Sequence, residues 1–147
     1  MDTHLPEYEL YAIRYAERDA RRADHFIGGD PHDGSMTAPA ELAPGITLHP
    51  VGGHTPGMQF VRVNTSRGSV VLTYDVTHYY ENMESGRPFT AAFHIGDMLE
   101  AYDALRAHAA SPNHIIPRHD PLVMRQYAAP RQELEGVVVR LDVMPKT

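Results

Sequence analysis

The sequence predicts a mixed α/β fold, of the α+β kind, in a single domain spanning residues 1–147. Three short runs at 46–51, 58–63 and 69–74 are apolar or alternate in polarity, which is typical of strands. A fourth segment, 97–109, carries apolar side chains at helical spacing. A chain of 147 residues can bury roughly two-thirds of its unfolded surface in one core, so no second domain is needed.

Composition narrows the possible partners. Hydrophobic residues make up 42% and charged residues 22% of the chain, as in globular proteins. The net charge is -6, and the densest basic run, 14–22, is interrupted by Glu17 and Asp19, which argues against nucleic acid as a partner. No apolar run approaches the ~20 residues of a membrane span, and Met1-Asp2 does not resemble the start of a signal peptide. We therefore expect no membrane partner and a cytoplasmic location.

Cysteine is absent, which excludes disulfides and thiolate ligands from this chain. Any bound metal must therefore be held by nitrogen and oxygen, which suits zinc but also cobalt, manganese or iron. Ten histidines fit such a protein, although a chain that tolerates surface histidine would show the same count. Only the positions of the histidines can distinguish a metal-binding protein from a chain that merely tolerates surface histidine.

The first third of the chain contains one expected strand and a long loop. Residues 8–15 alternate loosely and are rich in tyrosine, which predicts a strand. Residues 28–34 form a Gly-Pro loop, and we expect the pairs Asp24-His25 and His32-Asp33 to lie in solvent because such a loop does not fix ligand geometry. Residues 35–44 show no periodicity and are interpreted as a connector.

The strand predicted at 46–51 ends in the turn Gly52-Gly53-His54-Thr55-Pro56-Gly57. Glycines before the imidazole allow a positive φ or a close approach of the backbone. A histidine held on a stiff turn at a strand end suits a metal site, because its ring is aimed before the metal arrives. The alternative is a surface turn whose histidine has no function.

The strands at 58–63 and 69–74 are expected to form a hairpin through the loop at 64–68. The run Val70-Val71-Leu72 is continuously apolar, which predicts a strand covered on both faces. Asp75 follows it, and a carboxylate at the end of a buried strand is costly unless it is paired or binds a cation. Its alternative role is to cap the residues that follow.

The helix 97–109 is predicted from the helical spacing of Met98, Leu99, Tyr102 and Leu105. Met98 and Tyr102 are expected to contact the core, and His108 to face solvent or the helix dipole. Residues 111–113 stop the helix. A short strand at 114–116 then leads into a turn at 117–121 that carries His119-Asp120, and residues 137–143 predict a last strand. Three strand ends therefore carry His54, Asp75 and His119, and such side chains can converge on one site.

These motifs, in this order, resemble the N-acyl homoserine lactonase-like branch of the metallo-β-lactamase superfamily. The matching segments are GGHTPG, the strand that ends at Asp75 in LTYDVTHYYEN, and IIPRHDPLV. The resemblance implies an αββα sandwich that holds two metal ions, usually zinc. It implies that His54 binds the first ion, that Asp75 bridges both, and that His119 binds the second.

The sequence departs from that family in three places. The signature His-x-His-x-Asp-His, which supplies four further ligands, is absent: no two histidines are two residues apart. The fold expected is therefore a truncated metallo-β-lactamase-like αββα sandwich, with an internal deletion near residues 37–41. Arg118 replaces a glycine, which would strain the turn if its φ were positive. His78, followed by Tyr79, stands where some lactonases place a tyrosine.

The resemblance implies a metal-dependent hydrolase that opens an acyl homoserine lactone or a similar ester ring at a reduced metal site. Asp75, His78 and Tyr79 are its expected catalytic residues, with His78 or Tyr79 stabilising the oxyanion. The alternative is a catalytically inactive remnant that associates with itself or with a partner, because a missing block would leave a sheet face or edge uncovered.

Overall fold

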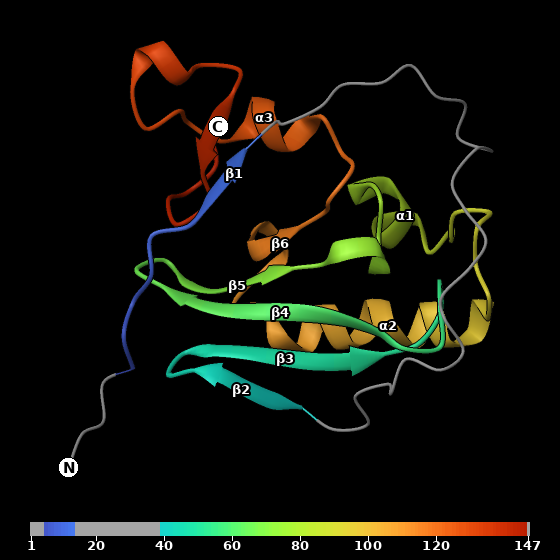
Figure 1. Ribbon diagram of the computed structural model, residues 1–147. Coiled ribbons are helices and arrows are strands. Elements are labelled where there is room, and N and C mark those ends of the chain that lie inside the picture. Colours follow the sequence, from blue (N-terminus) through green and yellow to red (C-terminus); the bar gives the residue numbers. More distant parts are fainter. Residues whose placement is uncertain (1–4, 14–38, 147) are drawn as a thin grey trace.

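The computed structural model describes residues 5–13 and 39–146. Within these residues, five strands form a sheet of order β2-β3-β4-β5-β6, and β1 pairs with β7 in a second, two-stranded sheet (Figure 1). The strands are β1 Tyr11–Ile13, β2 Ala40–Ala43, β3 Ile46–Val51, β4 Met58–Thr65, β5 Gly68–Leu72, β6 Ile115–Ile116 and β7 Val138–Arg140. The helices are α1 Tyr80–Ser85, α2 Ile95–His108 and α3 Leu122–Gln126, with 3-10 turns η2 Tyr74–Val76, η3 Pro112–His114 and η4 Gln132–Leu134. The mixed α/β class is as predicted.

The central strands follow the sequence pattern closely. β3 has the predicted bounds, and β4 extends the predicted strand by two residues to Thr65. β3, β4 and β5 are successively antiparallel, joined by the expected hairpin between β4 and β5. β6 then adds to β5 in parallel, with Leu72 opposite Ile116. This parallel pairing brings the carboxyl ends of β5 and β6 to the same edge of the sheet.

Both faces of β5 are covered, as its apolar run predicted. Val71 lies in a core cluster with α2 side chains such as Met98 and Leu105, while the adjacent Val70 lies in a second cluster with Val139 of β7. Both valines are fully buried. Figure 1 shows α2 lying along the sheet, with the small β1–β7 sheet and α3 on the opposite side of β5 and β6. The carboxyl end of β5 is therefore held from both faces.

The long helix differs from its prediction at the amino end. It begins at Ile95 rather than at residue 97, because the His94 side chain accepts a hydrogen bond from the Asp97 backbone N–H and caps it. Met98 and Tyr102 are buried in the core, as predicted, whereas Leu99 is 40% exposed. His108 lies in the last turn of α2, where the helix dipole favours a basic side chain, and its ring centroid is 4.0 Å from that of His49 on β3.

Short elements that carry little sequence signal were missed. β2 lies within the predicted connector, where its side chains are mostly exposed and a backbone ladder joins it to β3 at the edge of the sheet. α1 and α3 have six and five residues, too few for an apolar stripe to show. The strand expected at 69–74 ends at Leu72, and the chain turns through η2 instead.

The predicted terminal strands exist but are shorter. Of the run 8–15, residues 11–13 form β1, and residues beyond 13 lie outside the described part. Of 137–143, only 138–140 form β7. The pairs Asp24-His25 and His32-Asp33 also lie outside the described residues. Among the helices of the described ranges, none combines the length and apolar character that crossing a bilayer requires.

Asp142, which follows β7, supplies a pH-dependent contribution to stability. Its carboxylate is 3% exposed and accepts hydrogen bonds from the Arg140 guanidinium, one of them at 3.1 Å from Nε. The hydrogen bond from Arg140 lowers the pKa of Asp142, against the opposing effect of burial. A depressed folded-state pKa stabilises the protein above the unfolded pKa of about 3.9, and this contribution is lost as the pH falls through the lower folded-state value.

We therefore expect Asp142→Asn to lower the free energy of unfolding at pH 7 by about 1–2 kcal/mol, because charge-assisted hydrogen bonds contribute at this level and Arg140 is partly solvated. Urea unfolding at pH 7 and at pH 3 tests this, and the difference from wild type should shrink at pH 3. The matched control is Asp103→Asn, whose side chain is 82% exposed and pairs with Arg106 on the helix surface. If Asp142→Asn lost the same free energy of unfolding at pH 7 and at pH 3, packing and not charge would be responsible.

Candidate metal centre

The GGHTPG turn is docked onto the amino end of α2. Gly53 has φ +123°, and a Cβ at this position would lie 2.7 Å from the Met98 Cα, so both a positive φ and a close approach require glycine. The Gly53 carbonyl accepts a hydrogen bond of 2.9 Å from the His94 backbone N–H. The turn that carries His54 is therefore fixed to the helix.

His54 is oriented by the backbone. Its Nδ1 is hydrogen-bonded to the Ala91 carbonyl. A carbonyl only accepts, so Nδ1 carries the proton and the Nε2 of the neutral ring is the basic nitrogen. The ring lies with its centroid 6.1 Å from that of His78 and 5.4 Å from that of Phe89. Orientation through a second ring nitrogen is the arrangement seen around metal-binding histidines.

Asp75 lies in the η2 turn directly after β5. The turn is anchored by the fully buried Thr73 and Val76, and the Thr73 hydroxyl donates to the Thr77 carbonyl at 3.2 Å. Tyr74 has φ 53°, the one positive value among non-glycine residues of the described ranges. Such strain persists only where the surroundings enforce it, and it tends to occur at functional sites. Asp75 itself contacts side chains, so it is not the simple cap considered as the alternative.

His119 reaches Asp75 because β5 and β6 are parallel neighbours. Its backbone N–H donates to the His78 carbonyl at 3.2 Å. The following residue, Asp120, is buried and accepts the backbone N–H groups of Tyr80 at 3.0 Å and Leu122 at 2.9 Å. Asp120 thereby ties the His119 turn to the starts of α1 and α3.

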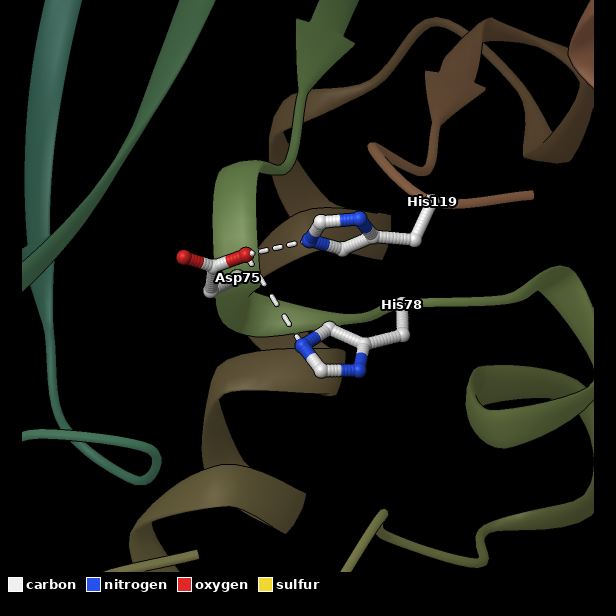
Figure 2. A group of neighbouring side chains, drawn as sticks. All are labelled: Asp75, His78 and His119. Carbon is white, nitrogen blue, oxygen red and sulfur yellow. Dashed lines mark hydrogen bonds and ion pairs between the residues drawn. The ribbon is translucent and has the colours of Figure 1, made fainter. Parts of the chain in front are cut away.

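His78 joins the same group from the first turn after Asp75. It is 7% exposed, and its ring stacks on Phe89 with centroids 3.6 Å apart and planes at 6°. Figure 2 shows the imidazoles of His78 and His119 directed at one carboxylate oxygen of Asp75. Their Nε2 atoms lie 3.7 and 2.9 Å from Asp75 Oδ1.

Two imidazoles and a carboxylate thus offer ligand atoms that all lie within 4.8 Å of one another. Three protein ligands with an open fourth position are the usual donor set of catalytic zinc. Two histidines and one carboxylate also suit iron, and nitrogen and oxygen donors accept cobalt or manganese. The residues present therefore fit a divalent cation.

Charges around Asp75 keep it ionised. Burial alone would raise the pKa of its carboxyl, but the hydrogen bond from His119 and the charges of Arg118, His119 and His78 together lower that pKa below its usual range. The Arg118 Nη1 lies 3.3 Å from Asp75 Oδ2. Arg118 is not among the positive-φ residues, so the strain considered for this arginine was wrong.

Of the residues named from the sequence, Asp75, His78 and His119 meet in this group. His54 borders His78 but stands outside it. Tyr79 is half-buried at the start of α1, where its backbone N–H donates to Asn82 Oδ1 at 3.1 Å. It lines a cavity of about 220 Å³ together with His78, Phe89 and His119. This cavity adjoins the cluster and provides room for a small molecule.

Two features of the site were not expected from the sequence. The sequence places His78 among the catalytic residues rather than the metal ligands. The chain leaves the η2 turn through the extended residue Thr77, and only the fold shows that the ring then lies beside Asp75. Phe89 carried no signal, because only the fold brings its ring over that of His78.

Comparisons with known proteins find similarity over a part of this chain. No family model matches the chain. Over 50 residues the chain is 42% identical to a curated N-acyl homoserine lactonase of Bacillus sp, a match that covers 33% of this chain and 20% of that protein.

Solved structures extend the similarity. One is an N-acyl homoserine lactone hydrolase with N-hexanoyl-L-homoserine, its product, bound at the catalytic metal centre. It matches with TM-score 0.55 and 30% identity over 61% of this chain and 36% of its own. A quorum-quenching N-acyl homoserine lactone hydrolase matches with TM-score 0.53 and 31% identity, over 60% of this chain and 37% of its own. The described fold therefore matches these lactonases, of the metallo-β-lactamase type, over a part of their length. This chain spans only about a third of theirs.

Proposed function

We propose that this chain binds a divalent cation, zinc in the simplest case, and acts as a lactonase-type hydrolase at a reduced metal site. The convergence of Asp75, His78 and His119 carries the proposal. Similarity to lactone hydrolases supports an acyl homoserine lactone or a related ester as the substrate. The single domain and the deletion near residues 37–41 stay predictions.

Each residue has a distinct task in this proposal. Asp75, His78 and His119 hold the cation, with the ionised carboxylate supplying the negative charge. A bound divalent ion supplies Lewis acidity toward a carbonyl and lowers the pKa of water, so that hydrolysis proceeds near neutral pH. The stack of His78 on Phe89 fixes the imidazole and keeps water from that side of the ring.

Tyr79 and His54 flank the cation site. Tyr79 lines the adjoining cavity, and its phenol is the group we assign to stabilising the oxyanion of a ring-opening step. His54 donates a hydrogen bond from Nδ1 to the Ala91 carbonyl, which leaves the lone pair on Nε2, and its ring lies beside that of His78. It is suited to accept a proton or to act as a further ligand.

Metal uptake and ring opening test the proposal together. The purified chain is stripped with chelator, reloaded with zinc, cobalt, manganese or iron(II), and freed of excess metal. We expect about one equivalent of retained metal and metal-dependent opening of N-hexanoyl homoserine lactone, followed as acid release. Tyr79→Phe should lower kcat about tenfold or more while leaving metal content unchanged.

Two outcomes contradict the proposal in different ways. Less than about a tenth of an equivalent of metal with no hydrolysis would favour the inactive remnant, since a site that retains no metal cannot supply this chemistry. Metal uptake without hydrolysis would leave a binding site and remove the enzymatic part.

A further inference from the structure

Arg118 occupies a defined position against the candidate metal centre. Its guanidinium carbon lies 4.7 Å from the centroid of the Tyr74 ring, while its Nη1 lies 3.3 Å from Asp75 Oδ2. The Arg118 guanidinium thus lies between an aromatic face and a carboxylate, two contacts that its planar shape favours. Tyr74 has a positive φ, and this backbone conformation belongs to the turn that places its ring beside Arg118.

The two oxygens of Asp75 are therefore divided between different partners. Oδ1 faces the Nε2 atoms of His78 and His119, and Oδ2 faces Arg118. A carboxylate can bridge two metal ions with one oxygen on each or with one oxygen shared by both. In the first mode the second ion needs Oδ2, and in the second mode it must find its other ligands on neighbouring side chains. Here one oxygen faces an imidazole pair, and the other already faces a permanent cation, because arginine does not lose its proton in proteins.

A second ion would also find few ligands. Within residues 5–13 and 39–146, Asp75, His78 and His119 are the one group of three or more histidine and acidic side chains close enough to hold a metal. His54 lies beside the group, with its ring centroid 6.1 Å from that of His78, and any ion on Oδ2 would meet the positive charge of the Arg118 guanidinium. Repulsion between the two positive charges opposes that arrangement.

We propose, on the basis of the function proposed above, that Arg118 takes the place of a second metal ion and makes this centre mononuclear. The guanidinium neutralises Asp75 Oδ2 and leaves Oδ1 as the ligand for a single cation. Arg118 is a positioning residue in this role, because it acts through Asp75 and not on a substrate.

Metal stoichiometry tests the proposal without any activity assay. Zinc is titrated into chelator-stripped protein against a competing chelator, and bound metal is counted at each free zinc concentration; cobalt spectra report the coordination of each ion. Wild type should saturate at one equivalent. Arg118→Ala should bind a second equivalent at least about tenfold more tightly than wild type does, because a unit charge close to a dication is removed. Arg118→Glu, which adds a carboxylate, should saturate at two.

The matched control is Arg125→Ala, an exposed arginine on α3, which should keep the wild-type stoichiometry of one. Two tightly bound equivalents in wild type would overturn the inference and leave the proposed function standing. A single equivalent in Arg118→Glu, with normal thermal unfolding, would overturn it too. No metal in any of the proteins would remove both the metal centre and this inference.

Discussion

Replacing Asp75 with asparagine is expected to weaken zinc binding by at least about 100-fold, since substitutions that only disturb ligand orientation already cost 10–100-fold. Asparagine keeps the shape of the side chain but removes the negative charge that faces His78, Arg118 and His119. Competition against a chelator of known affinity measures the change. Lactone opening at limiting zinc should fall in parallel.

Two controls separate metal binding from folding in that experiment. Asp103→Asn changes an exposed carboxylate on the far side of α2 from the core and should leave zinc affinity unchanged. The thermal unfolding of metal-free Asp75→Asn should also remain cooperative, because the Asp75 side chain is 25% exposed and is not part of either core cluster. Unchanged zinc affinity in Asp75→Asn would place the metal elsewhere.

Gly53→Ala is expected to lower the free energy of unfolding by about 3 kcal/mol or more, through backbone strain and overpacking together. The residue has φ +123°, and the new methyl group would lie 2.7 Å from the Met98 Cα and 2.9 Å from the Met98 backbone N. Backbone atoms of α2 cannot rotate away as a side chain can. The helix must shift, and His54 shifts with the turn.

Gly86→Ala provides the matched control, because Gly86 also has a positive φ, of +63°, but a Cβ there meets nothing within 4 Å. Only the conformational penalty of about 1 kcal/mol should remain. Urea unfolding of both variants at pH 7 gives the comparison. If both variants lost the same free energy of unfolding, the close approach of the new methyl group to Met98 would contribute nothing to the destabilisation.

The sequence predicted those parts of the fold in which a strand alternates between core and solvent or lies wholly in the core. The start of β4, where buried Met58 and Phe60 flank exposed Gln59, and the apolar run of β5 are examples, because burial of their side chains selects the residues directly. β2 shows no such pattern, since its side chains are mostly exposed and burial does not select them. α1 depends on contacts from other elements, such as the carboxylate of Asp120 at its start.

The same distinction applies to the candidate site. The approach of Asp75 and His119 follows from two strand ends, a pattern that is visible in the sequence. The stack of Phe89 on His78 and the ion pair of Arg118 with Asp75 are products of tertiary packing between residues far apart in the chain. No local spacing encodes them, so the substitution of arginine for glycine was read as strain and not as a charge partner.

The parallel pairing of β5 with β6 has a consequence for the order in which the chain folds. Asp75 and His119 are 44 residues apart, and they meet only once β6 has docked beside β5. Metal binding would then stabilise this long-range pairing of β5 with β6, which forms after the local hairpins, and not the hairpins themselves. A cation that binds only the form in which β6 is paired with β5 stabilises that form by mass action. Its uptake would therefore report that the last third of the chain has folded.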